Sequence, residues 1–195
     1  MKPILILVTN QAQYADFDIP TGLWLSELTH FYHTMEVHHI PVQIASLNGG
    51  QVPIDPASLQ EQFLDDVTKI YYHSTNFMAE LTNSKALKDF DPDDFSAIYF
   101  TGGHGAMYDF AENPLVADWI IKMDKNQGIV SAVCHGVAAL TNNSLNNQTS
   151  FVKGKIVTGY TNIEEDYVQH TNHVPFLLED RLGTLEADFQ QAAPF

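Results

Sequence analysis

Short apolar runs alternate with longer amphipathic segments along the chain. Four runs are almost wholly apolar, which is typical of strands buried on both faces; they span residues 4–8, 41–47, 97–100 and 129–133. Apolar side chains at spacings of three and four predict a helix over residues 21–36; they are Trp24, Leu28, Phe31 and Met35. This alternation predicts an α/β fold with a mostly parallel sheet and helices on both faces.

The segments between and after these strands predict further elements. In residues 113–128, Asn113 can cap a helix whose first residue is Pro114. Two apolar pairs flank Lys-Gly-Lys in 151–157, which favours a tight β-hairpin. We also expect short helices at 137–141 and 175–182, and an Asn-rich loop at 142–150. Residues 55–95 are polar and acidic, and we expect them to form a helical insertion within a single domain spanning 1–195.

The composition excludes several classes of protein. Nine Lys and Arg residues against 24 Asp and Glu residues give a net charge of −15 over 195 residues, which argues against binding nucleic acid or an anionic membrane. No apolar run approaches the length of a membrane span, and the start lacks a signal-peptide core. A single cysteine excludes an internal disulfide and fits a reducing compartment, so we expect a cytoplasmic protein.

That cysteine, Cys134, is a candidate nucleophile. It directly follows the strand at 129–133 and precedes Gly136, the context of a nucleophile elbow between a strand and a helix. A helix N-terminus there would lower the pKa of the thiol. The alternative is a small buried apolar residue. His135 beside it suits either a general base or a structural hydrogen bond.

Two further features carry possible chemistry. Glu27 borders the apolar stripe of the 21–36 helix, where partial burial would raise its pKa and let it donate a proton to a thiolate; the alternative is a carboxylate at the solvent boundary. A glycine-rich loop follows a buried strand; it consists of Gly102, Gly103, His104 and Gly105. Its backbone N–H groups could approach a ligand closely, as an oxyanion site requires. The alternative is an ordinary loop. In parallel sheets the carboxyl ends of strands meet, so residues 9–18, 101–109 and 134–136 should converge.

The remaining histidines do not indicate a metal centre. The pairs are His30/His33, His38/His39 and His170/His173. None has the spacing of a known zinc motif, and we expect exposed histidines and no bound metal.

Two stretches, 98–109 (IYFTGGHGAMYD) and 129–140 (IVSAVCHGVAAL), resemble the ThiJ/PfpI superfamily, whose fold is class I glutamine amidotransferase-like. Residues 21–27 (TGLWLSE) and 156–165 (IVTGYTNIEE) are similar to its heat-shock-protein-31-like branch, which contains glutathione-independent glyoxalases of the glyoxalase III type. The resemblance implies a flavodoxin-like three-layer α/β/α sandwich with a mostly parallel central sheet and, with the pattern at 151–157, a small β-hairpin.

The resemblance also implies roles for individual residues. Cys134 would be the nucleophile with His135 as its partner, and Glu27 falls at the position of the glutamate that contacts the sulfur. The acid that orients His135 would be Glu165, with Glu164 and Asn162 as alternatives. Backbone N–H groups of Gly103 and His104, next to Gly102, would form the oxyanion site. Candidate pocket walls are Trp24, Tyr108 and Tyr160.

The implied activity is a cofactor-independent conversion of a small carbonyl substrate, a 2-oxoaldehyde such as methylglyoxal, to a 2-hydroxy acid, a lyase or hydrolase reaction (D-lactate dehydratase). Alternatives are an intracellular cysteine amidase or protease, and a redox-responsive stress chaperone in which Cys134 is oxidised. The family resemblance also implies a homodimer. Members usually continue past residue 195 with a strand and a helix, so we expect either an open sheet edge or an incomplete rear layer.

Overall fold

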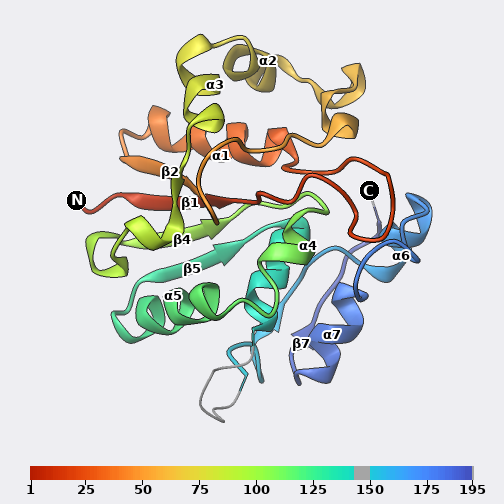
Figure 1. Cartoon of the computed structure of the whole chain (residues 1–195). Helices are drawn as coiled ribbons and strands as arrows, with labels where there is room; N and C mark the ends of the chain where they lie inside the picture. The colour runs from red at the N-terminus through yellow and green to blue at the C-terminus, as the bar shows by residue number, and fades with distance from the viewer. Residues whose placement is uncertain (143–149, 195) are drawn as a thin grey trace.

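The computed structural model describes residues 1–142 and 150–194, and its centre is a five-stranded sheet (Figure 1). The strand order is β3-β2-β1-β4-β5, and every pairing within this sheet is parallel. The expected α/β sandwich with a parallel central sheet is therefore confirmed. Most of the Asn-rich loop predicted at 142–150 lies outside the described residues.

The strands of the central sheet begin and end close to the predicted apolar runs. The strands are β1 (Ile4–Val8), β2 (Val42–Ser46), β3 (Lys85–Ala86), β4 (Ala97–Phe100), β5 (Ile129–Ala132), β6 (Ile156–Val157) and β7 (Asp188–Phe189). The α-helices are α1 (Leu25–Val37), α2 (Asp66–Tyr72), α3 (Thr75–Thr82), α4 (Ala106–Asp109), α5 (Pro114–Lys125), α6 (Asn162–Tyr167) and α7 (Leu178–Thr184). Short 3-10 helices are η1 (Pro56–Leu59), η2 (Glu61–Phe63), η3 (Leu87–Asp89), η4 (Pro92–Asp94) and η5 (Cys134–Thr141).

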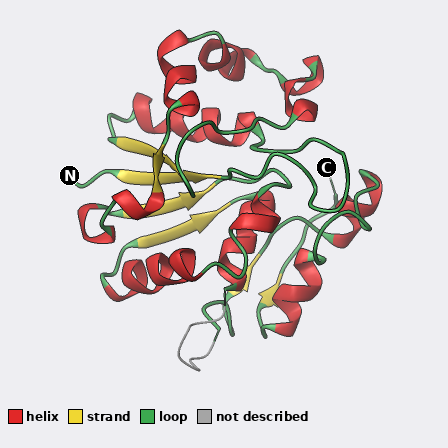
Figure 2. Ribbon diagram, viewed as in Figure 1, coloured by secondary structure: helices red, strands yellow, loops and turns green. Residues whose placement is uncertain are grey.

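Successive side chains of the strands point to opposite faces of the sheet and pack into two cores, one on each face. Ile6 and Val8 of β1 point into a core completed by α1, α2 and α3, which lie above the sheet in Figure 2. Leu5 and Leu7 point the other way, into a larger core that includes the buried Trp119 of α5. Burial on both faces explains why β1 is an unbroken apolar run.

Helix α1 begins four residues later than the sequence pattern predicts. Residues 21–24 are extended instead, because Leu23 pairs with Ile54 in a β-bridge and the Thr21 hydroxyl donates to the Asp55 carboxylate. The buried residues of α1 are Leu25, Leu28 and Thr29, so of the predicted stripe only Leu28 is fully buried, while Phe31 is partly buried against the same core.

The β-hairpin predicted at 151–157 is wrong. Residues 151–154 form turns in which Lys153 N–H donates to the Ser150 carbonyl. β6 then pairs in parallel with β7, whose residues lie 32 positions further along, through bonds such as Gln190 N–H to the Val157 carbonyl.

Residues 55–95 hold α2 and α3, several 3-10 turns and the two-residue strand β3 at one edge of the sheet. The helices are capped locally, since the side chains of Asp65 and Ser74 accept bonds from the N–H groups of Thr68 and Phe77. Among the described helices, none combines the length and the apolar character that crossing a membrane requires.

Candidate functional site

Cys134 lies at the sharp turn where β5 gives way to η5. Val133 is extended, whereas Cys134 has φ of 52°, in the left-handed region that a residue with a side chain rarely occupies. Strain of this kind is concentrated at functional sites, where the surrounding structure maintains it. The turn predicted as a nucleophile elbow is therefore present, and Cys134 keeps part of its surface exposed.

The carboxylate of Glu27 lies beside this cysteine. Glu27 is in the first turn of α1, accepts a 2.6 Å hydrogen bond from Gly102 N–H and is hydrogen-bonded to the Cys134 thiol. Burial raises the pKa of Glu27 to about 7, outweighing both hydrogen bonds, which lower it. The predicted rise is confirmed, and Glu27 exchanges a proton near neutral pH.

The pKa of Cys134 does not move in the predicted direction. Burial, the largest effect, and the charge of Glu27 raise it well above the usual thiol value. The N–H groups of His135 and Gly103 lower it, as expected at an elbow, but their effect is smaller. Thiolate character therefore depends on where the protons of Glu27 and His135 reside.

His135 links the thiol to a buried carboxylate. Its Nδ1 lies 3.4 Å from Cys134 Sγ, and its Nε2 lies 2.9 Å from Glu165 Oε2. The other oxygen of Glu165 lies 2.8 Å from His104 Nε2. All three of His104, His135 and Glu165 are buried, so one carboxylate serves two imidazoles.

Of the three candidates for the orienting acid, Glu165 is the one that contacts His135. Glu164 instead closes the capping box of α6 with Thr161, and the Asn162 side chain donates to Asp180. Burial opposes the charge of Glu165, yet hydrogen bonds from His104 and His135 outweigh it and lower its pKa to about 2. Glu165 is thus a carboxylate at neutral pH.

The glycine loop after β4 packs directly against these groups. A Cβ on Gly102 would meet Glu27 Oε2 at 2.5 Å. Gly103 has φ of +91°, and a Cβ there would lie 2.1 Å from the Gly22 carbonyl oxygen. These contacts require glycine, and they bring Gly103 N–H to the Cys134 sulfur. The predicted convergence of 101–109 with 134–136 is confirmed.

The third predicted segment, residues 9–18, also reaches this end of the sheet. Thr9 hydroxyl and Asn10 N–H donate to the half-buried carboxylate of Asp109, at 2.9 and 2.8 Å. Tyr14 stands 5.4 Å from the ring of His104, measured between centroids. All three segments after the strands therefore meet, as the parallel sheet requires.

The three candidate wall residues take different places. The Tyr160 ring lies 4.1 Å from the His135 ring, and the Trp24 backbone N–H donates to the Gly102 carbonyl. Tyr108 instead donates its hydroxyl to the His173 carbonyl and packs edge-on against Tyr14. Trp24 and Tyr160 thus border the cysteine network, whereas the contacts of Tyr108 are with a neighbouring aromatic group.

Tyr14, His170 and His173 form that group, and the sequence pattern gave them no role. The Tyr14 ring stacks on His170 with centroids 4.9 Å apart, and His170 Nδ1 lies 3.1 Å from His173 Nδ1. The expectation that His170 and His173 are exposed is wrong, because both are half-buried here. The available signals were the position of Tyr14 in the converging segment 9–18 and the spacing of His170 and His173.

Among the described residues, His104, His135 and Glu165 form a group whose ligand-type atoms lie within 4.8 Å of one another. Both oxygens of Glu165 already accept hydrogen bonds from the two imidazoles. We therefore interpret the group as a hydrogen-bonded network rather than a metal-ligand set. That the protein works without a metal or another cofactor stays a prediction.

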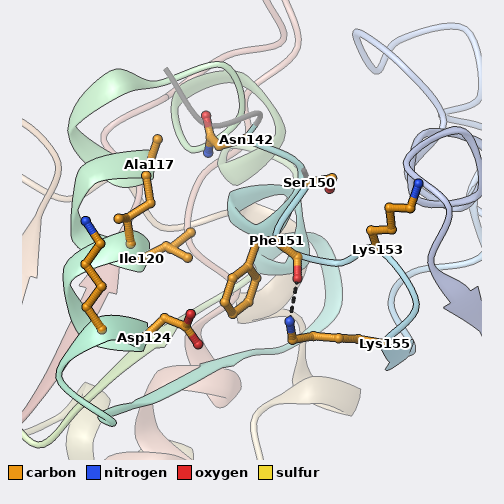
Figure 3. A pocket seen from close by; sticks show the side chains of 10 residues that line it. Ala117, Ile120, Asp124, Asn142, Ser150, Phe151, Lys153 and Lys155 are labelled. Carbon is orange, nitrogen blue, oxygen red and sulfur yellow. Dashed lines mark hydrogen bonds between the residues drawn. The ribbon is translucent and has the colours of Figure 1, made fainter. Parts of the chain in front are cut away.

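A pocket of about 330 Å³ lies elsewhere, between α5 and the chain after residue 150 (Figure 3). We call it the Phe151 pocket; its lining includes Ile120, Asp124, Phe151 and Lys155. Lys155 donates to the Phe151 carbonyl and lies over the Phe151 ring. None of the predicted site residues lines this pocket.

Comparisons with known proteins place this geometry in a family. The sequence profile of the DJ-1/PfpI family matches residues 4–175. Glyoxalase 3 of Candida albicans is 30% identical over 177 residues, 88% of this chain and 74% of that protein. The glutathione-independent glyoxalase HSP31 of Saccharomyces cerevisiae is 29% identical over 171 residues, 84% of this chain and 70% of that protein.

A solved structure is more similar still. The Rapid Encystment Protein 24 kDa of Francisella tularensis superposes with a TM-score of 0.95 at 37% sequence identity. The match covers 100% of this chain and 86% of that one.

Proposed function

Because the chain belongs to the DJ-1/PfpI family, we propose that it is a glutathione-independent glyoxalase that converts 2-oxoaldehydes such as methylglyoxal to 2-hydroxy acids. One observation carries the proposal: a cysteine on a strained turn is hydrogen-bonded to a glutamate with a pKa of about 7. The reaction needs such a pair, a nucleophile for the aldehyde and a group that takes and returns a proton at neutral pH. Relatives named as glyoxalases support it.

The first step would be addition of Cys134 Sγ to the aldehyde carbon. The thiol proton passes to His135 Nδ1, 3.4 Å away, or to Glu27. The aldehyde oxygen becomes the oxyanion of a hemithioacetal, held by the N–H groups of Gly103 and His104. Cys134 as a whole is of intermediate exposure although its thiol is buried, so this step requires that a small carbonyl compound gains access to Sγ.

Isomerisation would follow without a hydride carrier. Glu27 or His135 removes the proton from the former aldehyde carbon, which gives an enediol, and a proton then returns to the neighbouring carbon. The product is a thioester of Cys134. Water attacks it, releasing the 2-hydroxy acid and the thiol, so the overall reaction consumes one water and no external oxidant.

Glu165 has a separate role in this scheme. At a pKa of about 2 it stays ionised, accepts a hydrogen bond from His135 Nε2–H and leaves Nδ1 to face the sulfur. The same Cys-His-Glu chain also suits a cysteine amidase or peptidase, the second candidate. A panel of small amides and peptides assayed beside methylglyoxal separates the two.

The direct test is lactate formation from methylglyoxal in the absence of glutathione. We expect turnover by the wild type and a loss of at least about 10³-fold in Cys134→Ala, since the nucleophile is removed. Cys134→Ser, which keeps the side-chain size, is the matched control for folding. Equal and negligible rates in the wild type and Cys134→Ala would refute the proposal.

We further propose that residues 1–195 act as one domain with 55–95 as an insertion, and that the protein works as a cytoplasmic homodimer. A reducing compartment would keep its single thiol available. Light scattering of the purified protein tests the dimer, and a monomer at micromolar concentration would contradict it.

A further inference from the structure

We propose that the His104 side chain is a positioning residue for His135: by sharing the carboxylate of Glu165, it fixes the orientation of His135 and keeps that imidazole neutral. This inference deepens the proposed function and rests on it for the role of His135 as proton acceptor. His104 enters the proposed mechanism so far only through its backbone N–H, so its side chain gains a role of its own.

The first argument is the two-sided use of Glu165. Its oxygens lie 2.8 Å from His104 Nε2 and 2.9 Å from His135 Nε2. An ionised carboxylate only accepts hydrogen bonds, so each Nε2 must carry a proton. With both oxygens occupied, the carboxylate cannot rotate without breaking a bond. His135 is thereby held in the tautomer whose Nδ1 lone pair faces Cys134 Sγ.

The second argument is the closeness of the two rings. The centroids of His104 and His135 are 4.0 Å apart, and both rings are buried. Two imidazolium cations at this distance would repel each other, and they would share a single carboxylate. Burial, and next the proximity of His104, lower the pKa of His135 to about 4, against the opposing effect of Glu165. His135 is therefore free to accept a proton at neutral pH.

Groups from several elements surround His135 and can affect its protonation. They are Cys134 on its own element, His104 before α4, Glu165 on α6, Tyr160 before α6 and His170 after it. His170 also lowers the pKa of His135, but its effect is smaller than that of His104. His104 is thus the neighbouring imidazole whose replacement should change His135 most.

The third argument is the place of His104 in the chain. It follows Gly103, whose N–H donates to the Cys134 sulfur, in the loop proposed to hold the oxyanion. Its bond to Glu165 ties this loop to α6 across 61 positions of sequence. One side chain therefore aligns the oxyanion loop and the Cys-His-Glu chain with each other.

Two substitutions separate the donor from the imidazole. In His104→Gln, the amide nitrogen can take the place of Nε2 and still donate to Glu165, but the side chain cannot become charged. In His104→Leu, a side chain of similar bulk supplies neither the donor nor the charge. We expect His104→Leu to lower kcat about 10- to 100-fold with a smaller change in KM. His104→Gln should lose much less kcat.

The closing experiment needs no turnover. The Cε1 proton resonance of His135, assigned by its loss in His135→Asn, is titrated by NMR in the wild type and both variants. We expect its midpoint to rise by about one pH unit in His104→Gln, since the neighbouring imidazole that lowers the pKa of His135 is removed. In a separate assay of turnover, the acid limb of the kcat profile should move to higher pH in parallel.

The outcomes separate the two proposals. An unchanged or lower midpoint in His104→Gln would overturn the role of His104, whether or not His104→Leu folds. Equal losses of kcat in both variants would reduce the role of His104 to ring packing and would overturn the positioning role. A raised midpoint in a protein that makes no lactate would support the role of His104 while refuting the glyoxalase.

Discussion

The Cys134 network and the Phe151 pocket are opposite kinds of site. The network is compact: Cys134 has a left-handed backbone, and the pKa values of Glu27, His135 and Glu165 lie near 7, 4 and 2. The pocket has a volume of about 330 Å³, and the backbones that line it have ordinary φ values. Buried titratable groups that contact one another indicate a catalytic site, whereas the volume of a pocket alone does not.

The largest effect that would sharpen this contrast is expected from Glu27→Gln. Glutamine can still accept the bond from Gly102 N–H, but it cannot take up or release a proton near neutral pH. We expect kcat with methylglyoxal to fall about 10²- to 10⁴-fold. Glu36→Gln, on the exposed side of the same helix, is the matched control and should keep the wild-type rate. A Glu27→Gln enzyme with wild-type kcat would remove Glu27 from the mechanism.

The smallest effect is expected in the pocket. Lys155 is exposed, and its contacts are with the carbonyl and ring of Phe151. Lys155→Ala should change the free energy of unfolding by no more than about 0.5 kcal/mol and leave kcat/KM unchanged. Urea unfolding and the lactate assay measure both. A tenfold fall in kcat/KM would show that the Phe151 pocket takes part in the activity, and it would contradict the distinction drawn between the two sites.

The strands that could be predicted are those whose burial shows in a short run of neighbouring residues. Residues 4–8 and 97–100 are apolar throughout because both faces are covered, and they form β1 and β4. The two-residue strand β3 is too short for a pattern. The pairing of β6 with β7 joins residues 32 positions apart, so the apolar pairs around Lys-Gly-Lys predicted a local hairpin that does not form.

The features of the site likewise divide into those that the sequence predicts and those that depend on the whole fold. The elbow at Cys134 follows from residues next to each other in the sequence, whereas the close packing of Gly103 is against residues 22–24, far away in the chain. The contact of Glu165 rather than Glu164 with His135 depends on how α6 docks, which no spacing reveals. The direction of the Cys134 pKa depends on burial, and burial is set by the whole fold.

The central claim is that the activity resides in the Cys134 thiol. The chain has one cysteine, so alkylation by iodoacetamide, followed by intact mass, reports on this residue alone. With substoichiometric reagent, the fraction of glutathione-independent lactate formation that is lost should equal the fraction of chains alkylated, down to no activity at full modification. A fully alkylated protein that still forms lactate from methylglyoxal would contradict the account.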